Sequence, residues 1–102
     1  DLNYDNPDLR RAMIDAMRFW IEQMNLDGFR CDVAGMVPAD FWNAARKELE
    51  AIKPLWMLAE DEGQTWLMNE AFNANYGWSF HHTMNELAKG AVTADCIYGY
   101  FE

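Results

Sequence analysis

Apolar side chains recur every three or four residues in the first quarter of the chain, with charged residues mostly between them. The apolar positions are Leu9, Ala12, Met13, Ala16, Met17, Trp20, Ile21 and Met24. This spacing places them along one side of an α-helix. Asn6 and Pro7 form a favourable start, because Asn caps free backbone N–H groups and Pro suits the first helical turn. The pattern predicts a helix from Pro7 to about Met24.

Two short apolar stretches follow, separated by a second helical pattern. Residues Phe29 to Ala34 come after a turn at 25–28 and predict a first strand. The second helix should run from about Pro38 to Ile52. Leu55 to Ala59 is apolar at every position. Such a run predicts a second strand that is buried on both faces, as in a parallel sheet.

The last third of the chain continues the alternation with shorter elements. We expect a short helix from Thr65 to about Ala71 and a third strand within Phe72–Trp78. A longer helix should have Ser79 as its cap and end near Lys89, before Gly90. Helices and strands that alternate in this order predict an α/β fold with a parallel sheet.

The composition is that of a folded domain with an acidic surface. Of the 102 residues, 51% are hydrophobic, and the formal net charge is -9. This charge argues against nucleic acid and anionic membranes as partners, since both require a basic face. No apolar run approaches the roughly 20 residues that cross a bilayer. The two cysteines form neither a disulfide framework nor a zinc motif.

Two carboxylates stand at the ends of the first two predicted strands. Asp32 lies near the end of the first, and Glu60 directly follows the second. Neighbouring parallel strands are about 4.8 Å apart, so the two groups can approach the roughly 5–5.5 Å separation of a retaining glycosidase. Arg30 shares the face of Asp32 and can hold it ionised. On spacing alone, solubility or helix capping explains such carboxylates more often than catalysis does.

Three local stretches are more specific than the spacing. Asp27–Ala34 reads DGFRCDVA and resembles the nucleophile stretch of the α-amylase family, on the fourth strand of its barrel. Met57–Glu60 resembles the family's acid/base stretch on the fifth strand. Asp1–Pro7 is similar to the segment that leads into the third helix. The resemblance implies a partial (β/α)8 TIM barrel with about three parallel strands.

The resemblance also implies a role for each charged residue. Asp32 would be the nucleophile, Glu60 the general acid/base, and Arg30 the residue that places Asp32. The implied activity is retaining cleavage of α-glucosidic bonds in starch-like or oligosaccharide substrates. Two alternatives stay open, a transglycosylase of the same family and a non-catalytic amylase-like binding or structural subunit. A metal-dependent barrel enzyme is less well supported, because the third strand end offers Asn73 and Asn75 rather than a carboxylate.

The substrate contacts are harder to predict. Many members of the family carry His or a Lys-His pair where this chain has Gly35 and Met36. The contacts on the leaving-group side should therefore differ. Trp66, Tyr76 and Trp78 lie near predicted strand ends, where aromatic rings can stack on sugars. Core packing or contact with another part of the protein is the favoured explanation for these rings.

The whole chain, residues 1–102, reads as one internal segment of a catalytic barrel domain. It opens with Asp1 rather than Met and has no leader sequence, so the compartment stays open between secreted, periplasmic and cytoplasmic. A complete barrel needs about 250 residues. We therefore expect the isolated segment to be inactive, to need no cofactor, and to form a homo-oligomer through its open sheet edges. Calcium is implied only for the full-length protein.

Overall fold

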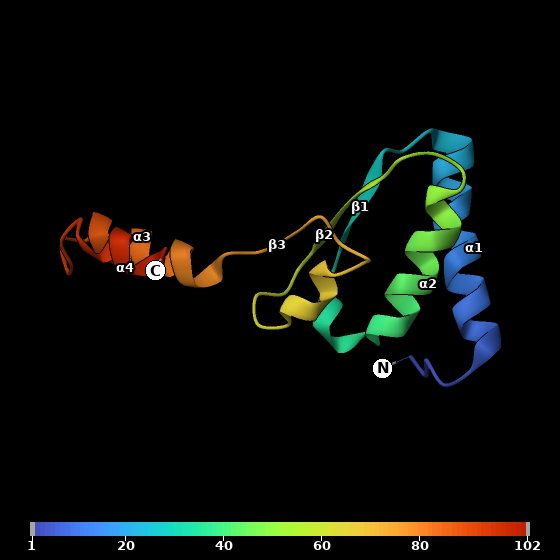
Figure 1. The fold of residues 1–102 in the computed structure, drawn as a ribbon, viewed down its shortest axis with the longest axis horizontal. Coiled ribbons are helices and arrows are strands. Elements are labelled where there is room, and N and C mark those ends of the chain that lie inside the picture. Colours follow the sequence, from blue (N-terminus) through green and yellow to red (C-terminus); the bar gives the residue numbers. More distant parts are fainter. Residues whose placement is uncertain (1, 102) are drawn as a thin grey trace.

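The computed structural model describes residues 2–101, so Asp1 of the predicted opening motif lies outside it. These residues form four helices, three strands and two short 3₁₀ turns, whose arrangement can be followed in Figure 1. In chain order these are α1 (Pro7–Met24), β1 (Gly28–Cys31), η1 (Ala34–Met36), α2 (Ala39–Glu50), β2 (Trp56–Ala59), η2 (Thr65–Met68), β3 (Ala74–Asn75), α3 (Trp78–Ala88) and α4 (Cys96–Tyr100). No helix among the described residues is long and apolar enough to cross a membrane.

The three strands form one parallel sheet in the order β1-β2-β3. Cys31 pairs with Ala59, and Ala59 pairs with Asn75, so the carboxyl ends of all three strands meet at one edge. The connections between them contain α2 and η2. The predicted α/β class with parallel strands is therefore confirmed.

Helix α1 has the predicted bounds. The Asn6 side chain accepts the backbone N–H of Asp8 at 2.8 Å, which caps the first turn. At the other end Asn25 adopts a left-handed conformation with φ 52°. Asn tolerates this conformation better than most residues, so the chain can turn sharply into β1.

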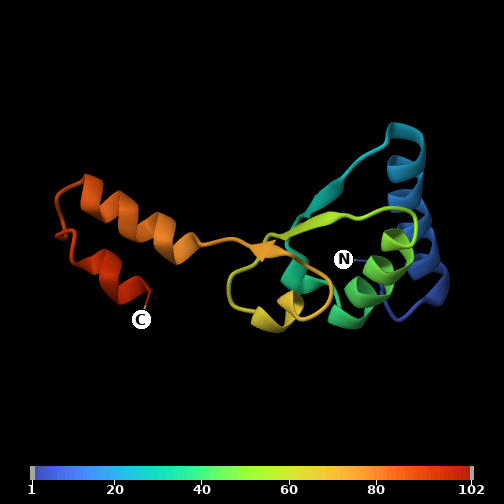
Figure 2. The same cartoon turned by 45° about the horizontal axis from the view of Figure 1, so that its top comes forward.

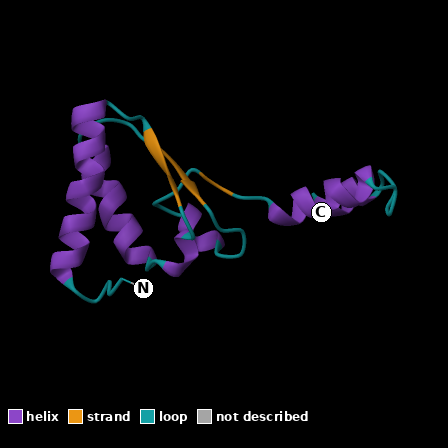
Figure 3. Cartoon of the chain, turned by 180° about the vertical axis from the view of Figure 1, so that it is seen from behind, coloured by secondary structure: helices purple, strands orange, loops and turns teal. Residues whose placement is uncertain are grey.

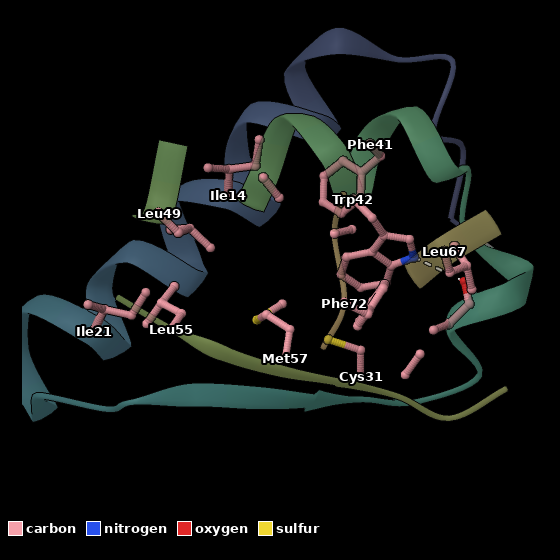
Figure 4. Close-up of a cluster of buried hydrophobic side chains, with 14 residues drawn as sticks. Ile14, Ile21, Cys31, Phe41, Trp42, Leu49, Leu55, Met57, Leu67 and Phe72 are labelled. Atoms are coloured by element: carbon pink, nitrogen blue, oxygen red, sulfur yellow. Dashed lines mark hydrogen bonds between the residues drawn. The ribbon is translucent and has the colours of Figure 1, made fainter. Parts of the chain in front are cut away.

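Helices α1 and α2 pack on the same face of the sheet and enclose the core. Figure 4 shows Phe41 and Leu49 of α2 above Met57 of β2, and Ile21 of α1 at the left edge of the same cluster. All four side chains are almost completely buried. Trp42 is buried as well, and its Nε1–H donates to the Ala34 carbonyl at 3.0 Å. The core therefore extends to the turn that follows β1.

The opposite face of the sheet is open in residues 2–101. Figure 3 shows both long helices on one side of the strands. Met57 and Ala59 of β2 are buried against those helices, whereas Trp56 is 54% exposed. The expectation that β2 is buried on both faces is therefore wrong for this chain. Side chains alternate along a strand, and α1 and α2 cover only one of the two faces.

Helices α3 and α4 form an arm that extends away from the sheet (Figures 1 and 2). The first helix of the arm begins at Trp78, one residue before the predicted cap. Ser79 lies inside α3, and its backbone N–H donates to both Glu62 carboxylate oxygens at 3.0 Å. A carboxylate from the loop after β2 thus satisfies the helix start, and the prediction of Ser79 as the cap is wrong.

Candidate active site

Asp32 and Glu60 occupy equivalent positions after two paired strands. Asp32 directly follows β1, and Glu60 directly follows β2. The backbone N–H of Glu60 donates to the Cys31 carbonyl at 3.0 Å, and the N–H of Ala34 donates to the Glu60 carbonyl at 3.2 Å. These two bonds continue the pairing past the strand ends. The two acidic residues therefore start side by side at the carboxyl edge of the sheet.

Arg30 contacts both carboxylates. Its Nη1 donates to Asp32 Oδ1, and its Nη2 lies 2.8 Å from Glu60 Oε1. The third guanidinium nitrogen, Nε, donates to the Tyr76 hydroxyl at 3.0 Å. The predicted proximity of Arg30 and Asp32 is confirmed. The sequence pattern did not predict the bonds to Glu60 and Tyr76, because the partners come from other strands.

The two carboxylates differ in environment. The Asp32 side chain is 76% exposed, whereas that of Glu60 is 21% exposed. The hydrogen bond from Arg30 lowers the pKa of Asp32 below its usual value. In turn, the Tyr76 hydroxyl and Asp32 raise the pKa of Arg30. Asp32 therefore stays ionised at neutral pH and is accessible at the surface, as a nucleophile must be.

The residue after Asp32 has an unusual backbone. Val33 adopts φ 44° and ψ 48°, a left-handed conformation that is rare for a β-branched side chain. Strand β1 ends at Cys31 for this reason, three residues before the predicted end at Ala34. The Val33 N–H donates to Glu60 Oε2 at 2.8 Å. Strained residues of this kind concentrate at functional sites.

Gly35 lets the loops after β1 and β2 come together. The Gln64 side-chain amide donates to the Gly35 carbonyl at 2.7 Å, and the Gln64 backbone N–H donates to Asp61 Oδ1 at 2.6 Å. A Cβ on residue 35 would lie 2.2 Å from Asp61 Oδ2 and 2.3 Å from Gln64 Nε2. No larger residue fits here unless these side chains move. Asp61 accepts the hydrogen bond from the Gln64 backbone N–H, so its carboxylate is used in this loop contact rather than at Arg30.

The three aromatic candidates lie in different places. Tyr76 is at the carboxylate pair through its bond to Arg30, and the Trp78 ring lies 5.7 Å from the Tyr76 ring, edge to face. Trp66 is on η2, and its side chain is 54% exposed. Among the described residues it forms no aromatic pair with the other two. Tyr76 and Trp78 therefore form one aromatic pair beside Arg30, and Trp66 is not part of it.

A hollow of about 410 Å³ adjoins Asp32. Its walls are mostly apolar and include Tyr4, Val33, Met36 and Val37. The Met36 side chain is 72% exposed. A ligand that reaches Asp32 from this side therefore meets a thioether and aliphatic groups.

Metal ligands do not gather in the part of the chain that the structure covers. Within residues 2–101, no three His, Cys, Asp or Glu side chains are placed to hold one ion. Calcium prefers six to eight oxygen ligands, several of them carboxylates.

Comparison with known proteins gives a consistent family match. A family model described as "Alpha amylase, catalytic domain" matches residues 1–93. The maltogenic alpha-amylase of Bacillus acidopullulyticus is 36% identical over 73 residues, which cover 69% of this chain and 12% of that protein. A cyclomaltodextrinase of Geobacillus thermopakistaniensis (strain MAS1) is 33% identical over 76 residues, which cover 72% of this chain and 13% of the relative.

A solved structure gives the same match in three dimensions. The crystal structure of a maltogenic alpha-amylase from Thermotoga neapolitana has a TM-score of 0.83 and 38% identity to this chain. The match covers 92% of this chain and 22% of the other. The chain thus spans about an eighth of the length of the two curated relatives.

Proposed function

Since the chain belongs to the α-amylase family, we propose that it supplies two catalytic carboxylates, Asp32 and Glu60, to a retaining glycoside hydrolase. Its three parallel strands are part of a (β/α)8 TIM barrel, as predicted. In such barrels the carboxyl ends of the strands form the active-site face. The observation that carries the proposal is that both carboxylates bind one guanidinium at this face.

The proposed mechanism has two steps. Asp32 attacks the anomeric carbon and forms a covalent glycosyl ester, while Glu60 donates its proton to the departing glycosidic oxygen. Glu60 then takes a proton from water, which attacks the same carbon and releases the sugar with its original configuration. The lowered pKa of Asp32 supports its role as nucleophile, and the smaller exposure of Glu60 suits a proton donor.

Arg30 has a supporting role in this mechanism. It stabilises the ionised form of Asp32 and contacts Glu60, so one cation holds both side chains. When the glycosyl ester forms, Asp32 loses its charge and Glu60 becomes charged by giving up its proton, so Arg30, which lies 2.8 Å from Glu60 in the free chain, keeps a charged partner. The guanidinium therefore keeps both reacting groups in place throughout the cycle.

The proposed substrates are α-glucosidic bonds of starch-like glucans or oligosaccharides. Two of the relatives are a maltogenic alpha-amylase and a cyclomaltodextrinase. Trp66, Tyr76 and Trp78 remain predicted sugar-binding residues, and all three are at least partly exposed. The apolar hollow beside Asp32 would contact the C–H groups on one face of a sugar ring rather than its hydroxyl groups.

The 102-residue chain alone should be inactive. It covers 12% and 13% of two relatives, and we propose that the other active-site groups lie elsewhere in a longer protein. Residues 1–102 would then be one continuous part of the catalytic domain. If a longer protein binds calcium, most of its ligands would come from outside this part.

The test uses the full-length protein that contains this chain. A 5-fluoroglycosyl fluoride of the glucose series should form a stable ester, and peptide mapping by mass spectrometry should find it on Asp32. Asp32→Asn and Glu60→Gln should each lower kcat by at least about a thousandfold, because each removes a reacting group. Asp15→Asn, on the exposed surface of α1, is the matched control. Label on another residue, or near-normal turnover in Asp32→Asn, would refute the assignment.

A further inference from the structure

We propose that Tyr76 is a positioning residue whose hydroxyl orients Arg30 and, through it, the pair Asp32 and Glu60. This inference rests on the proposed function, because it assigns Tyr76 to the same site. Neither the family match nor the names of the relatives give this residue a role. The proposal follows from how the three guanidinium nitrogens are used.

Each nitrogen of Arg30 has a different partner. Nη1 binds Asp32, Nη2 binds Glu60, and Nε binds the Tyr76 hydroxyl at 3.0 Å. A guanidinium is planar, so a partner at Nε fixes the direction in which the two Nη groups point. Without that partner the last torsions of the side chain can rotate. The Tyr76 hydroxyl therefore determines whether Arg30 reaches both carboxylates at once.

Tyr76 is itself held in place by its neighbours. It directly follows β3, as Asp32 follows β1 and Glu60 follows β2. Its backbone N–H donates to the Asp61 carbonyl at 3.1 Å, so the residue is tied to the loop after β2. The Trp78 ring packs against its ring, edge to face. These two contacts hold the Tyr76 side chain in place, so its hydroxyl has a fixed position at Arg30. Residues from the ends of three strands therefore contact one guanidinium.

The charges around Asp32 make this orientation matter. Arg30 faces it from β1, and Glu60 faces it from the end of β2. Tyr76, from the end of β3, faces Arg30. If Arg30 moves away, two carboxylates remain beside each other with no cation between them. The hydrogen bond from Arg30 is the main cause of the lowered pKa of Asp32, so without it this pKa would rise and Asp32 would ionise less readily.

The experiment replaces Tyr76 by Phe in the full-length protein. This change removes the hydroxyl and keeps the ring, so a stacking role is preserved. We expect kcat to fall by about tenfold to a hundredfold, as when reacting groups are slightly misplaced, with little change in KM. The acidic limb of the kcat/KM profile should move to higher pH, because the pKa of Asp32 rises. Tyr98→Phe, at a side chain that is 74% exposed, is the matched control.

A double-mutant cycle separates the proposed role from a purely structural one. Arg30→Lys removes Nε, so Tyr76→Phe should cause no further loss of kcat in that background. An equal further loss would show that Tyr76 acts independently of Arg30 and would overturn the inference. The unfolding midpoint of each variant verifies that the fold is intact.

Two other outcomes are also decisive. If Tyr76→Phe has the kcat and pH profile of the wild type while Tyr76→Ala raises KM, the ring binds sugar and the hydroxyl positions nothing. If Asp32→Asn retains activity, the proposed function fails, whatever Tyr76 does. The two failures are therefore distinguishable.

Discussion

The backbone N–H of Val33 donates to the carboxylate of Glu60 at 2.8 Å, across the two paired strand ends. Val33 makes this bond from a left-handed conformation, φ 44°, that costs a β-branched residue about 1–3 kcal/mol. The next residue, Ala34, is completely buried and bonded through both backbone groups, to Glu60 and to Trp42. The buried turn therefore enforces the strain and directs the N–H at the proposed acid/base.

Substitutions at Val33 should separate the strain from the hydrogen bond. Asn tolerates the left-handed region and keeps the N–H, so Val33→Asn should leave the free energy of unfolding within about 1 kcal/mol of the wild type. Val33→Pro removes the donor and requires φ near −65°, so it should cost about 3 kcal/mol or more. Denaturant unfolding measures both. A Val33→Pro protein as stable as the wild type would contradict the observed backbone.

Gly28 should not accept a side chain. It pairs with Trp56 at the start of β1, and a Cβ there would lie 1.7 Å from the Trp56 carbonyl oxygen. Gly28→Ala should therefore destabilise the protein by about 3 kcal/mol, because two strands would have to separate. Gly63→Ala is the matched control, since a Cβ at Gly63 meets nothing within 4 Å. Equal unfolding midpoints for the two variants would disprove the close approach.

The order of helices and strands could be predicted from the sequence because it depends on local patterns. The apolar spacing and the Asn6 cap gave the bounds of α1, and a continuous apolar run located β2. The positions of Asp32 and Glu60 followed from strand ends alone. That Arg30 and Asp32 share a face followed from the two-residue period of a strand.

The remaining features depend on contacts between distant residues. The left-handed Val33 is imposed by Ala34 and Trp42, and no local pattern indicates it. Glu62 caps α3 from a position 17 residues away, so the nearby Ser79 was the wrong expectation. The exposure of Trp56 depends on which sheet face the helices cover. Neither the spacing of residues nor the composition indicates any of these three features.

The two cysteines should react at very different rates. Cys31 is buried beneath the proposed site, and burial raises the pKa of its thiol to about 12, although Arg30 opposes the shift. The thiolate is the reactive form, so Cys31 should resist an alkylating reagent at pH 8 until the protein unfolds. Cys96, which is only partly buried, should label first in the native state. Peptide mass spectrometry with and without denaturant measures both rates.

The raised pKa of the Cys31 thiol also predicts how the free energy of unfolding depends on pH. The folded pKa of Cys31 lies above the ordinary value of 9.0, so folding favours the protonated thiol. This group should not affect the free energy of unfolding below about pH 9, and should lower it as pH rises from about 9 to about 12. Cys31→Ala should lose this part of the alkaline dependence. Unchanged alkaline unfolding in Cys31→Ala would mean that the thiol is not buried in solution.

The isolated 102-residue chain should self-associate through its open sheet. Within residues 2–101, β1 and β3 each have one edge without a partner strand, and Trp56 and Leu58 line an apolar hollow of about 320 Å³ on the uncovered face. Apolar faces and strand edges of this kind drive association. Sedimentation velocity should therefore show species larger than a monomer at micromolar concentration, and Trp56→Lys should weaken the association. Trp20→Lys, at an exposed position on α1, is the control. A monomer at every concentration would mean that the open face does not associate.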